Sequence, residues 1–388
     1  MAAEAVSTQS DLTLLAEIRR YGQFDGNACY QCGSCTLACE LAAGNLNLPR
    51  KSIRQVLLGL RGPVLGSLEP WICHDCGECS ELCPRQAEPR ISMFTLRHFL
   101  HAQYDWTGIS GRLLRSRVAY SSALAVAALL TVLLGLWYHW HYAQLGWSDA
   151  TTAMGLEHAF PIMNYFTRTV ILLPLLLLVS QSGRMWWLAM MRAPATRVPL
   201  SAYLAEARTY LWHSAGQSLL RECLDNTRWT GHWLMALGVT MMLVIKVVAL
   251  PWFQTDGIYP ISHPQRWLGY LATLFILYGV VDILVERIRA DKEFSKERRF
   301  EHFVFPVLLL LTGLTGIAAH IFRYAGFELT CHYLYALHVI VATPMLLVEI
   351  PFGHWSHMIS RPLALYFYSV RERAEGRVPE PEVLRAAA

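Results

Sequence analysis

Two short stretches, CYQCGSCTLAC at residues 29–39 and CHDCGECSELCP at residues 73–84, decide the fold of the N-terminal part of the chain. Both place four cysteines in the spacing C-x2-C-x2-C-x3-C. This spacing is typical of [4Fe–4S] proteins, in which a tight loop wraps three thiolates around one cluster and the fourth cysteine points elsewhere. The duplicated motif therefore predicts a small domain that holds two [4Fe–4S] clusters.

In two-cluster proteins the fourth cysteine of each motif binds the cluster of the other motif. The predicted ligands are therefore Cys29, Cys32, Cys35 and Cys83 for cluster one, and Cys73, Cys76, Cys79 and Cys39 for cluster two. Structural zinc is the alternative, but zinc sites usually combine two C-x2-C pairs across a longer spacer. The motifs favour iron, and the cysteines are expected to bind metal rather than to act as nucleophiles.

The segment between the motifs predicts an amphipathic helix at about residues 49–60, because its apolar residues recur at helical spacing. These residues are Ile53, Val56, Leu57 and Leu60. The basic segment after the second motif, residues 91–117, reads as an amphipathic connector that lies on a surface. Its histidines, His98 and His101, are expected to be solvated or lipid-facing rather than metal ligands.

Beyond residue 117 the sequence is strongly apolar. The whole chain of 388 residues is 54% hydrophobic and 16% charged, against a usual charged share of about a quarter in soluble domains. Six stretches approach the roughly 20 apolar residues that span a bilayer. They lie at about 118–140, 160–183, 230–252, 266–286, 302–322 and 331–352. A soluble helical bundle is the disfavoured alternative, and the net charge of +4 gives no reason to expect nucleic-acid binding.

Loop charge predicts the orientation of these spans. Residues 184–228 and 287–299 are rich in arginine and lysine. The alternate stretches, at about 141–167, 253–265 and 324–337, contain neither, with only Arg266 and Arg323 at their borders. Short cytoplasmic loops collect positive charge, so both termini and the cysteine-rich head are expected on the cytoplasmic side of the inner membrane. No signal peptide is visible in the first twenty residues.

The predicted fold is mainly α: a helical two-cluster ferredoxin-like domain followed by a six-helix transmembrane cytochrome b bundle. The predicted domains are 1–90 for the ferredoxin-like head, 91–117 for the linker, 118–360 for the membrane domain and 361–388 for a cytoplasmic tail.

Histidines in the spans predict haem b, which needs two facing imidazoles at one membrane depth. His232, near the start of the third span, pairs in depth with His357, although His302 and His354 compete for this inner site. On the outer side His338 is the leading candidate, with His320 and Met242 competing as its partner. His338 and His357 are 19 residues apart, roughly 28 Å along a helix, so one segment can serve two haems.

Lys246 is the leading intramembrane charge, because an unpaired charge in hydrocarbon is costly and therefore marks a functional candidate. It lies fourteen residues beyond His232, on nearly the same helical face. Hydrogen bonding to a quinone carbonyl or a haem propionate is one interpretation; snorkelling to the outer interface is the other.

The head resembles the C-type subunits of heterodisulfide reductases, through both cysteine motifs, PRKSI at 49–53 and WICHDC at 71–76. The membrane part resembles the nitrate reductase gamma type of cytochrome b, to which the E-type subunits of heterodisulfide reductases are related, through TGIAAH at 315–320 and PFGHWSH at 351–357. The fusion of the two, over about residues 20–360, resembles the C-type subunit of quinone-interacting membrane-bound oxidoreductase (Qmo) complexes.

The resemblance implies an electron-transferring subunit of a quinone oxidoreductase complex, which is catalytic only within that complex. Its electrons pass between the quinone pool, haem b, the two clusters and a cytoplasmic partner. The implied partners are two flavin-containing subunits like heterodisulfide reductase A, and adenylylsulfate reductase.

The cytochrome family implies His232 and His357 as inner haem ligands. That family binds the outer haem through a second histidine on the helix that matches span three. This chain has Met242 near that place, and His320 is the expected substitute ligand. The alternatives are a subunit of another heterodisulfide- or nitrate-reductase-like complex, or a haem-free anchor for the head.

Overall fold

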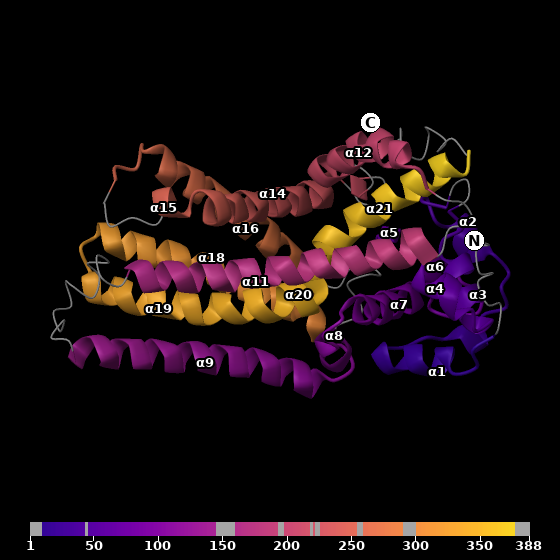
Figure 1. Cartoon of the computed structure of the whole chain (residues 1–388), viewed down its shortest axis with the longest axis horizontal. Helices are drawn as coiled ribbons and strands as arrows, with labels where there is room; N and C mark the ends of the chain where they lie inside the picture. Colours follow the sequence, from indigo (N-terminus) through magenta and orange to yellow (C-terminus); the bar gives the residue numbers. More distant parts are fainter. Residues whose placement is uncertain are drawn as a thin grey trace.

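The computed structural model describes residues 10–42, 46–144, 160–192, 198–217, 220–221, 226–253, 259–289 and 300–376. Within these ranges the chain is helical and contains no strand. Figure 1 shows two parts: a head of short helices at one end and a bundle of long helices extending from it. The predicted mainly α fold, with a small helical head before a bundle of long apolar helices, is confirmed at this level.

The head is built from helices of one or two turns joined by loops, as expected where cysteine loops rather than long amphipathic faces set the chain path. They are α1 (Leu14–Ile18), α2 (Ser34–Leu37), α3 (Arg50–Leu57), α4 (Arg61–Leu65), α5 (Glu69–Ile72) and α6 (Glu78–Glu81). The predicted helix between the motifs is present as α3, which buries Ile53 and Val56.

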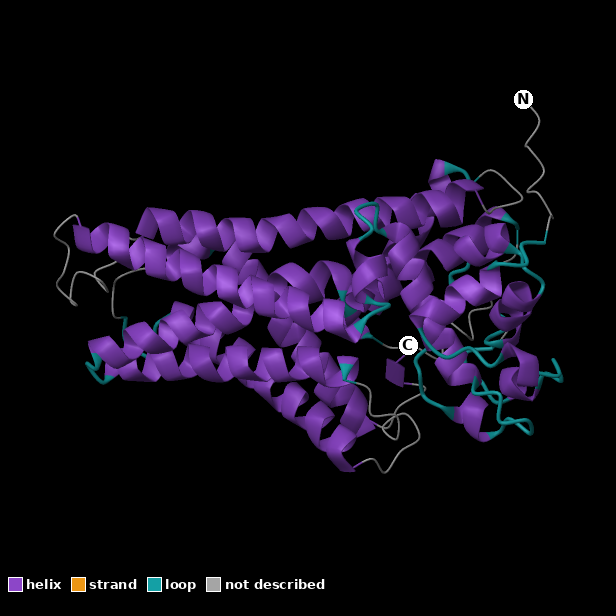
Figure 2. Cartoon of the chain, turned by 90° about the horizontal axis from the view of Figure 1, so that it is seen from below, coloured by secondary structure: helices purple, strands orange, loops and turns teal. Residues whose placement is uncertain are grey.

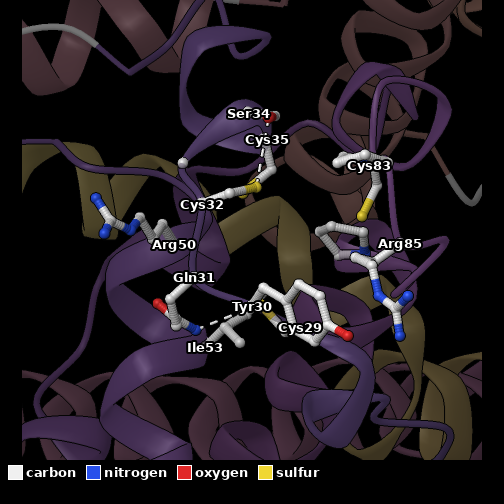
Figure 3. A pocket seen from close by; sticks show the side chains of 13 residues that line it. Cys29, Tyr30, Gln31, Cys32, Ser34, Cys35, Arg50, Ile53, Cys83 and Arg85 are labelled. Carbon is white, nitrogen blue, oxygen red and sulfur yellow. Dashed lines mark hydrogen bonds between the residues drawn. The ribbon is translucent and has the colours of Figure 1, made fainter.

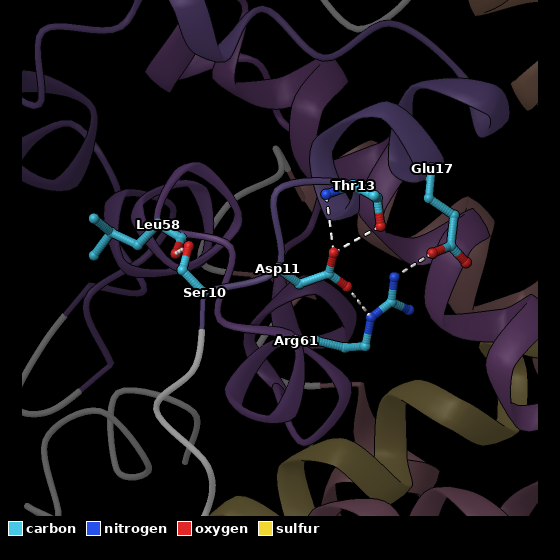
Figure 4. Close-up of polar contacts among 6 residues, drawn as sticks. All are labelled: Ser10, Asp11, Thr13, Glu17, Leu58 and Arg61. Carbon is cyan, nitrogen blue, oxygen red and sulfur yellow. Dashed lines mark hydrogen bonds and ion pairs between the residues drawn. The ribbon is translucent and has the colours of Figure 1, made fainter.

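Arg61 ties the start of the chain to α4. It donates a hydrogen bond of 2.6 Å from Nε to Asp11 and pairs with Glu17 on α1 (Figure 4). The hydroxyl and main-chain N–H of Thr13 donate to the same Asp11 carboxylate. These hydrogen bonds, those from Thr13 first and then that from Arg61, lower the pKa of Asp11 to about 2.

Helix α7 (Pro89–Tyr104) lies inside the molecule rather than on its surface. Met93, Leu96, Phe99 and Leu100 are fully buried, and His98 and His101 are buried too. The expectation of a surface connector with solvated or lipid-facing histidines therefore differs from the structure. Periodicity did not reveal this because α7 is packed on several sides, by α3, α5 and α11. Short α8 (Ile109–Leu113) then leads into the first span.

In the described part of the chain, six helices are long and apolar enough to cross a membrane, which confirms the six predicted spans. They cover Arg117–His141, Tyr165–Arg192, Asn226–Val248, Pro264–Arg289, His302–Tyr324 and Leu329–Phe352. The corresponding helices are α9 (Arg117–Gln144), α11 (Phe160–Trp186), α14 (Asn226–Val248), α16 (Pro264–Arg289), α18 (Glu301–Tyr324) and α19 (Glu328–Pro344). α14 packs along α16, and α18 packs along α19 and α16. Short α15 (Leu250–Phe253) follows α14.

The last span does not end as a regular helix. After Pro344 the chain forms a π-helical segment, Met345–Glu349, then α20 (Ile350–Phe352) and a single 3₁₀ turn, His354–Ser356. Proline lacks an N–H and crowds the preceding turn, so Pro344 and Pro351 account for this irregularity. The bend re-aims the chain, and α21 (His357–Ala374) starts in a new direction.

α21 leaves the bundle and packs into the head. It contacts α5 and α12 (Leu200–Gly216), and its buried residues Ala364, Leu365, Phe367 and Val370 share one hydrophobic core with Trp71, Ile72 and Phe99. Figure 1 shows α21 running from the end of the bundle beside α12, and Figure 2 shows that the described parts of head and bundle consist of helices and loops. The head and the bundle are therefore joined through a common core and not only through the chain between α7 and α9.

Candidate functional site

The structure gathers the eight motif cysteines into two groups of four. Cys29, Cys32, Cys35 and Cys83 line one pocket (Figure 3). Cys39, Cys73, Cys76 and Cys79 line a second pocket. Each group contains three cysteines of one motif and the fourth cysteine of the other, which is the grouping that the sequence predicts for the two clusters.

A glycine in the left-handed region makes each cysteine loop possible. Gly33 has φ +94° and Gly77 has φ +103°, and each directly precedes a short helix, α2 or α6. Residues with a Cβ rarely adopt this conformation. Each glycine stands between the second and third cysteines of its motif, so the tight turn lets three sulfurs approach one centre.

Burial makes these thiols poor acids on their own. Burial, followed by the neighbouring Cys73, raises the pKa of Cys39 to about 12, and burial also raises the pKa of Cys35 and Cys79. A cationic metal centre reverses this effect, since metal binding deprotonates coordinating thiols. Four thiols that line one pocket are a donor set whose chemistry fits an iron–sulfur cluster.

The two pockets differ in their surroundings. Beside cluster one, Cys32 is exposed, Tyr30 is 69% exposed, and Arg85 lies 4.2 Å above the Tyr30 ring. Leu37 and Leu82, near the ends of the two motifs, are also exposed. Cluster two lies on the side of α7, since Arg90 lines its pocket and pairs with Asp75 at 3.5 Å.

In the bundle His232 and His357 face each other. Their ring centroids are 6.5 Å apart, with the ring planes at 47°. Two imidazole–metal bonds of about 2 Å each, as at zinc, plus the reach from each ring centre to its nitrogen, place two axial ligands about 6 Å apart. The pair predicted for the inner haem therefore lies at a spacing that fits one metal between the rings.

Hydrogen bonds fix the orientation of both rings. His232 Nδ1 lies 2.7 Å from Gln217 Oε1, and His357 Nδ1 lies 2.6 Å from the main-chain oxygen of His354. Because these oxygens only accept, Nδ1 carries the proton in each ring and Nε2 keeps its lone pair. Metal-binding histidines are usually held in this way.

The competing inner histidines have other partners. His354 Nε2 lies 3.0 Å from His98 Nε2, and the His302 ring packs edge-on against Phe94 and His354. These three histidines form a contact between the head and the bundle, next to the main-chain turn that orients His357.

His338, predicted as a ligand of the outer haem, is oriented like the inner pair. Its Nδ1 lies 3.0 Å from the main-chain oxygen of Thr312 and 3.2 Å from the Thr315 hydroxyl. The ring rests on Gly316, where a Cβ would approach His338 Cε1 to 3.1 Å. Lys246 acts electrostatically on the same ring, and its Nζ lies 4.9 Å from the centre of the Phe253 ring.

His320 has hydrogen bonds at both nitrogens: Arg266 Nη1 lies 2.9 Å from Nε2, and the Tyr270 hydroxyl lies 3.2 Å from Nδ1. Coordination by His320 would replace one of these bonds. Its role as an outer ligand stays a prediction, as do those of Met242, His338 and Lys246.

Three residues without a predicted role connect cluster two to the inner histidines. Arg97 on α7 and Arg361 on α21 both donate through Nη2 to the carbonyl oxygen of Cys73, at 2.8 and 3.0 Å. The adjacent His74 lines the cluster-two pocket. Burial and the charges of Arg361, Arg97 and His232 hold the pKa of His74 well below its usual range. The only sequence signal for His74 is its place inside the second motif.

Comparisons with known proteins match the N-terminal head of the chain to iron–sulfur proteins. The 4Fe-4S dicluster domain family matches residues 13–88. A protein of Archaeoglobus profundus described as like the C-type subunit of heterodisulfide reductase is 32% identical over 126 residues, which are 32% of this chain and 67% of that protein. The second iron–sulfur subunit of type C of the CoB–CoM heterodisulfide reductase of Methanocaldococcus jannaschii is 44% identical over 71 residues, 18% of this chain and 38% of that protein. No solved structure gives a significant match.

Proposed function

The chain belongs to the family of iron–sulfur proteins that resemble the C-type subunits of heterodisulfide reductases, and from this premise we propose that it is a membrane protein that carries electrons between a quinone pool and a redox partner at the head. The observation that carries the proposal is the His232–His357 pair, whose ring centroids are 6.5 Å apart. His357 begins α21, the helix whose Arg361 also binds the cluster-two loop at Cys73. A tether for an iron–sulfur head has no need of two half-buried, oriented imidazoles that face each other.

The proposed order of carriers is partner, cluster one, cluster two, inner haem and quinone. Exposure of Cys32 and Tyr30 supports cluster one as the end that meets the partner. The bond from Arg361 to Cys73 supports cluster two as the end next to the haem, because Arg361 lies one helical turn beyond His357 on α21. The same chain of carriers serves either direction of electron flow.

The residues of the chain bind and orient in this function. The eight thiolates hold the clusters, His232 and His357 hold the inner haem, and Gln217 and the His354 carbonyl keep the proton on Nδ1 of each ring. Haem b supplies one-electron transfer when it is bound. Reduction of a quinone takes two electrons and two protons and yields the quinol; the reverse releases them. His338 is the proposed ligand of an outer haem, with His320 or Met242 opposite, and Lys246 is the proposed quinone contact.

The proposed partners at cluster one are flavin-containing subunits like heterodisulfide reductase A, and through them adenylylsulfate reductase. The named relatives belong to heterodisulfide reductases, so a heterodisulfide reductase-like catalytic subunit is the second candidate. Affinity purification from the native host, with identification of the copurifying subunits, distinguishes the two.

Haem analysis of the purified protein tests the core of the proposal. We expect b-type absorbance on reduction with a quinol analogue and two haems per chain in a pyridine haemochrome assay. His357→Ala should remove one of them, whereas His139→Ala, an exposed histidine, should remove none. A wild-type protein with both clusters and no haem would leave only the anchor function.

A further inference from the structure

The imidazole of His74 is a buried polar group that the proposed function leaves without a role. Both of its ring nitrogens are buried and have no hydrogen-bond partner among the residues that the structure describes. Burying a polar group without a partner costs free energy. A ligand bound beside His74 would complete the hydrogen bonds of this ring.

Two guanidinium groups accompany this imidazole. Arg97 donates from Nε to Pro70 at 2.6 Å and from Nη2 to Cys73 at 2.8 Å, and Arg361 donates from Nε to Trp71 at 3.1 Å. The charges of both arginines act on His74. Arg97 makes no ion pair with a carboxylate in the described part of the chain. Two partly buried cations beside an unpartnered N–H donor attract an anion.

His74 also stands between two cofactor sites. It lines the pocket of cluster two, next to Cys73. Arg361 reaches the same place from α21, four residues after His357. An anion held here would lie beside the space between His232 and His357.

From this arrangement we propose that His74, supported by Arg97 and Arg361, binds a carboxylate of the inner haem. The inference rests on the haem proposed above and adds a residue of the head to its binding site. A haem b carries two propionates, which supply the anionic oxygens, and His74 supplies the N–H. The contact joins the loop of cluster two to the haem edge, so the head and the membrane domain build this site together.

Optical redox titration of the inner haem in two variants tests this role. His74→Phe keeps an aromatic ring and removes the N–H donor, whereas His74→Gln keeps a donor. Loss of the donor leaves the propionate charge less neutralised and favours ferric haem, so we expect His74→Phe to lower the haem potential. His74→Gln should stay close to the wild type, and the electron paramagnetic resonance signal of cluster two should be unchanged in both.

Reconstitution of the haem-depleted protein with haem dimethyl ester tests the carboxylate itself. Esterification removes the charge and should shift the inner haem potential strongly in the wild type and less in His74→Phe. Should His74→Phe fail to assemble, the wild-type comparison still decides: equal potentials with haem and its ester would overturn the proposal. A His74→Phe change confined to cluster two would overturn it as well, because the imidazole would then serve the cluster.

These outcomes separate the inference from the function on which it rests. A wild-type protein without inner haem contradicts the proposed function. If the wild type holds the haem, and the inner haem potential is the same in the wild type, His74→Phe and His74→Gln, only the role of His74 is contradicted.

Discussion

Arg361 and Cys73 are 288 residues apart in sequence, yet the guanidinium Nη2 of Arg361 donates a 3.0 Å hydrogen bond to the carbonyl oxygen of Cys73. The same side chain donates from Nε to the carbonyl oxygen of Trp71 at 3.1 Å. α21, which begins at His357, is thereby fixed to the loop that opens the second cysteine motif. The relative position of cluster two and the inner histidines depends on this contact.

Arg361→Met should destabilise the junction of head and bundle. It removes two hydrogen bonds from a charged donor and leaves the carbonyls of Trp71 and Cys73 with fewer partners. The free energy of unfolding should therefore fall by about 2 to 4 kcal/mol. Denaturant unfolding in detergent, followed through the visible absorbance of the clusters, measures it. Arg208→Met, at an exposed position, is the control. Equal unfolding midpoints for the two variants would show that the contact contributes nothing.

His101 should make the protein less stable as the pH falls below about 6.5. Burial lowers the pKa of His101 to about 4, against smaller opposing effects of Asp105 and the Pro351 carbonyl. Between the folded value and the unfolded value of about 6.5, only the unfolded chain binds this proton, so stability is lost on acidification. From pH 7 to 5.5 the loss is about 1 kcal/mol for this one group.

His101→Gln should flatten this pH dependence, because glutamine does not titrate. The measurement is the free energy of unfolding at pH 7 and 5.5 for the wild type, His101→Gln and the exposed control His139→Gln. Only His101→Gln should lose less stability than the wild type over this interval. A pH dependence identical in all three proteins would contradict the assignment.

The features set by local sequence were predictable. Ligand spacing within eleven or twelve residues indicates how the cysteines group, and apolar stretches of about 20 residues indicate the spans, because both depend on neighbours along the chain. The depth of His232 and His357 followed from span boundaries alone, and the structure places the two rings together.

Features that depend on long-range packing were not predictable. α7 carries Arg90, Arg97, His98 and His101, which read as the polar face of a surface helix. In the structure Arg97 binds main-chain carbonyls and His98 contacts His354, 256 residues away. Polar residues buried by such pairing have the same sequence signature as solvated ones, so neither the burial of α7 nor the setting of His74 could be predicted from one sequence.

Gln217 should control how tightly the inner haem is held. Its Oε1 accepts a 2.7 Å hydrogen bond from His232 Nδ1. Loss of such a partner typically weakens metal binding by roughly 10- to 100-fold. Gln217→Met should therefore speed haem loss to excess apomyoglobin. Gln217→Glu should retain the haem and lower its potential, since a carboxylate is a stronger acceptor. Haem loss at the wild-type rate in Gln217→Met would exclude this role.

Cys39→Ser should remove cluster two, although Cys39 stands in the first motif. Cys83→Ser should remove cluster one, although Cys83 stands in the second motif. Cys39 lines the pocket of Cys73, Cys76 and Cys79, and Cys83 lines the pocket of cluster one. Either substitution should lower the iron content by about half, because one of two four-iron clusters is lost. Cys331→Ser, a buried thiol outside both pockets, should leave iron unchanged.

The surviving cluster identifies which one was lost. Cluster two lies on the side of His357, because Arg361, one helical turn beyond His357, binds the carbonyl of Cys73. In Cys83→Ser the remaining cluster should therefore be broadened magnetically by the oxidised inner haem in electron paramagnetic resonance spectra. In Cys39→Ser the remaining cluster one, with its exposed Cys32, should lack that broadening and should no longer pass electrons to the haem. The opposite pattern would mean that the fourth ligands are not exchanged, with Cys39 bound to cluster one and Cys83 bound to cluster two.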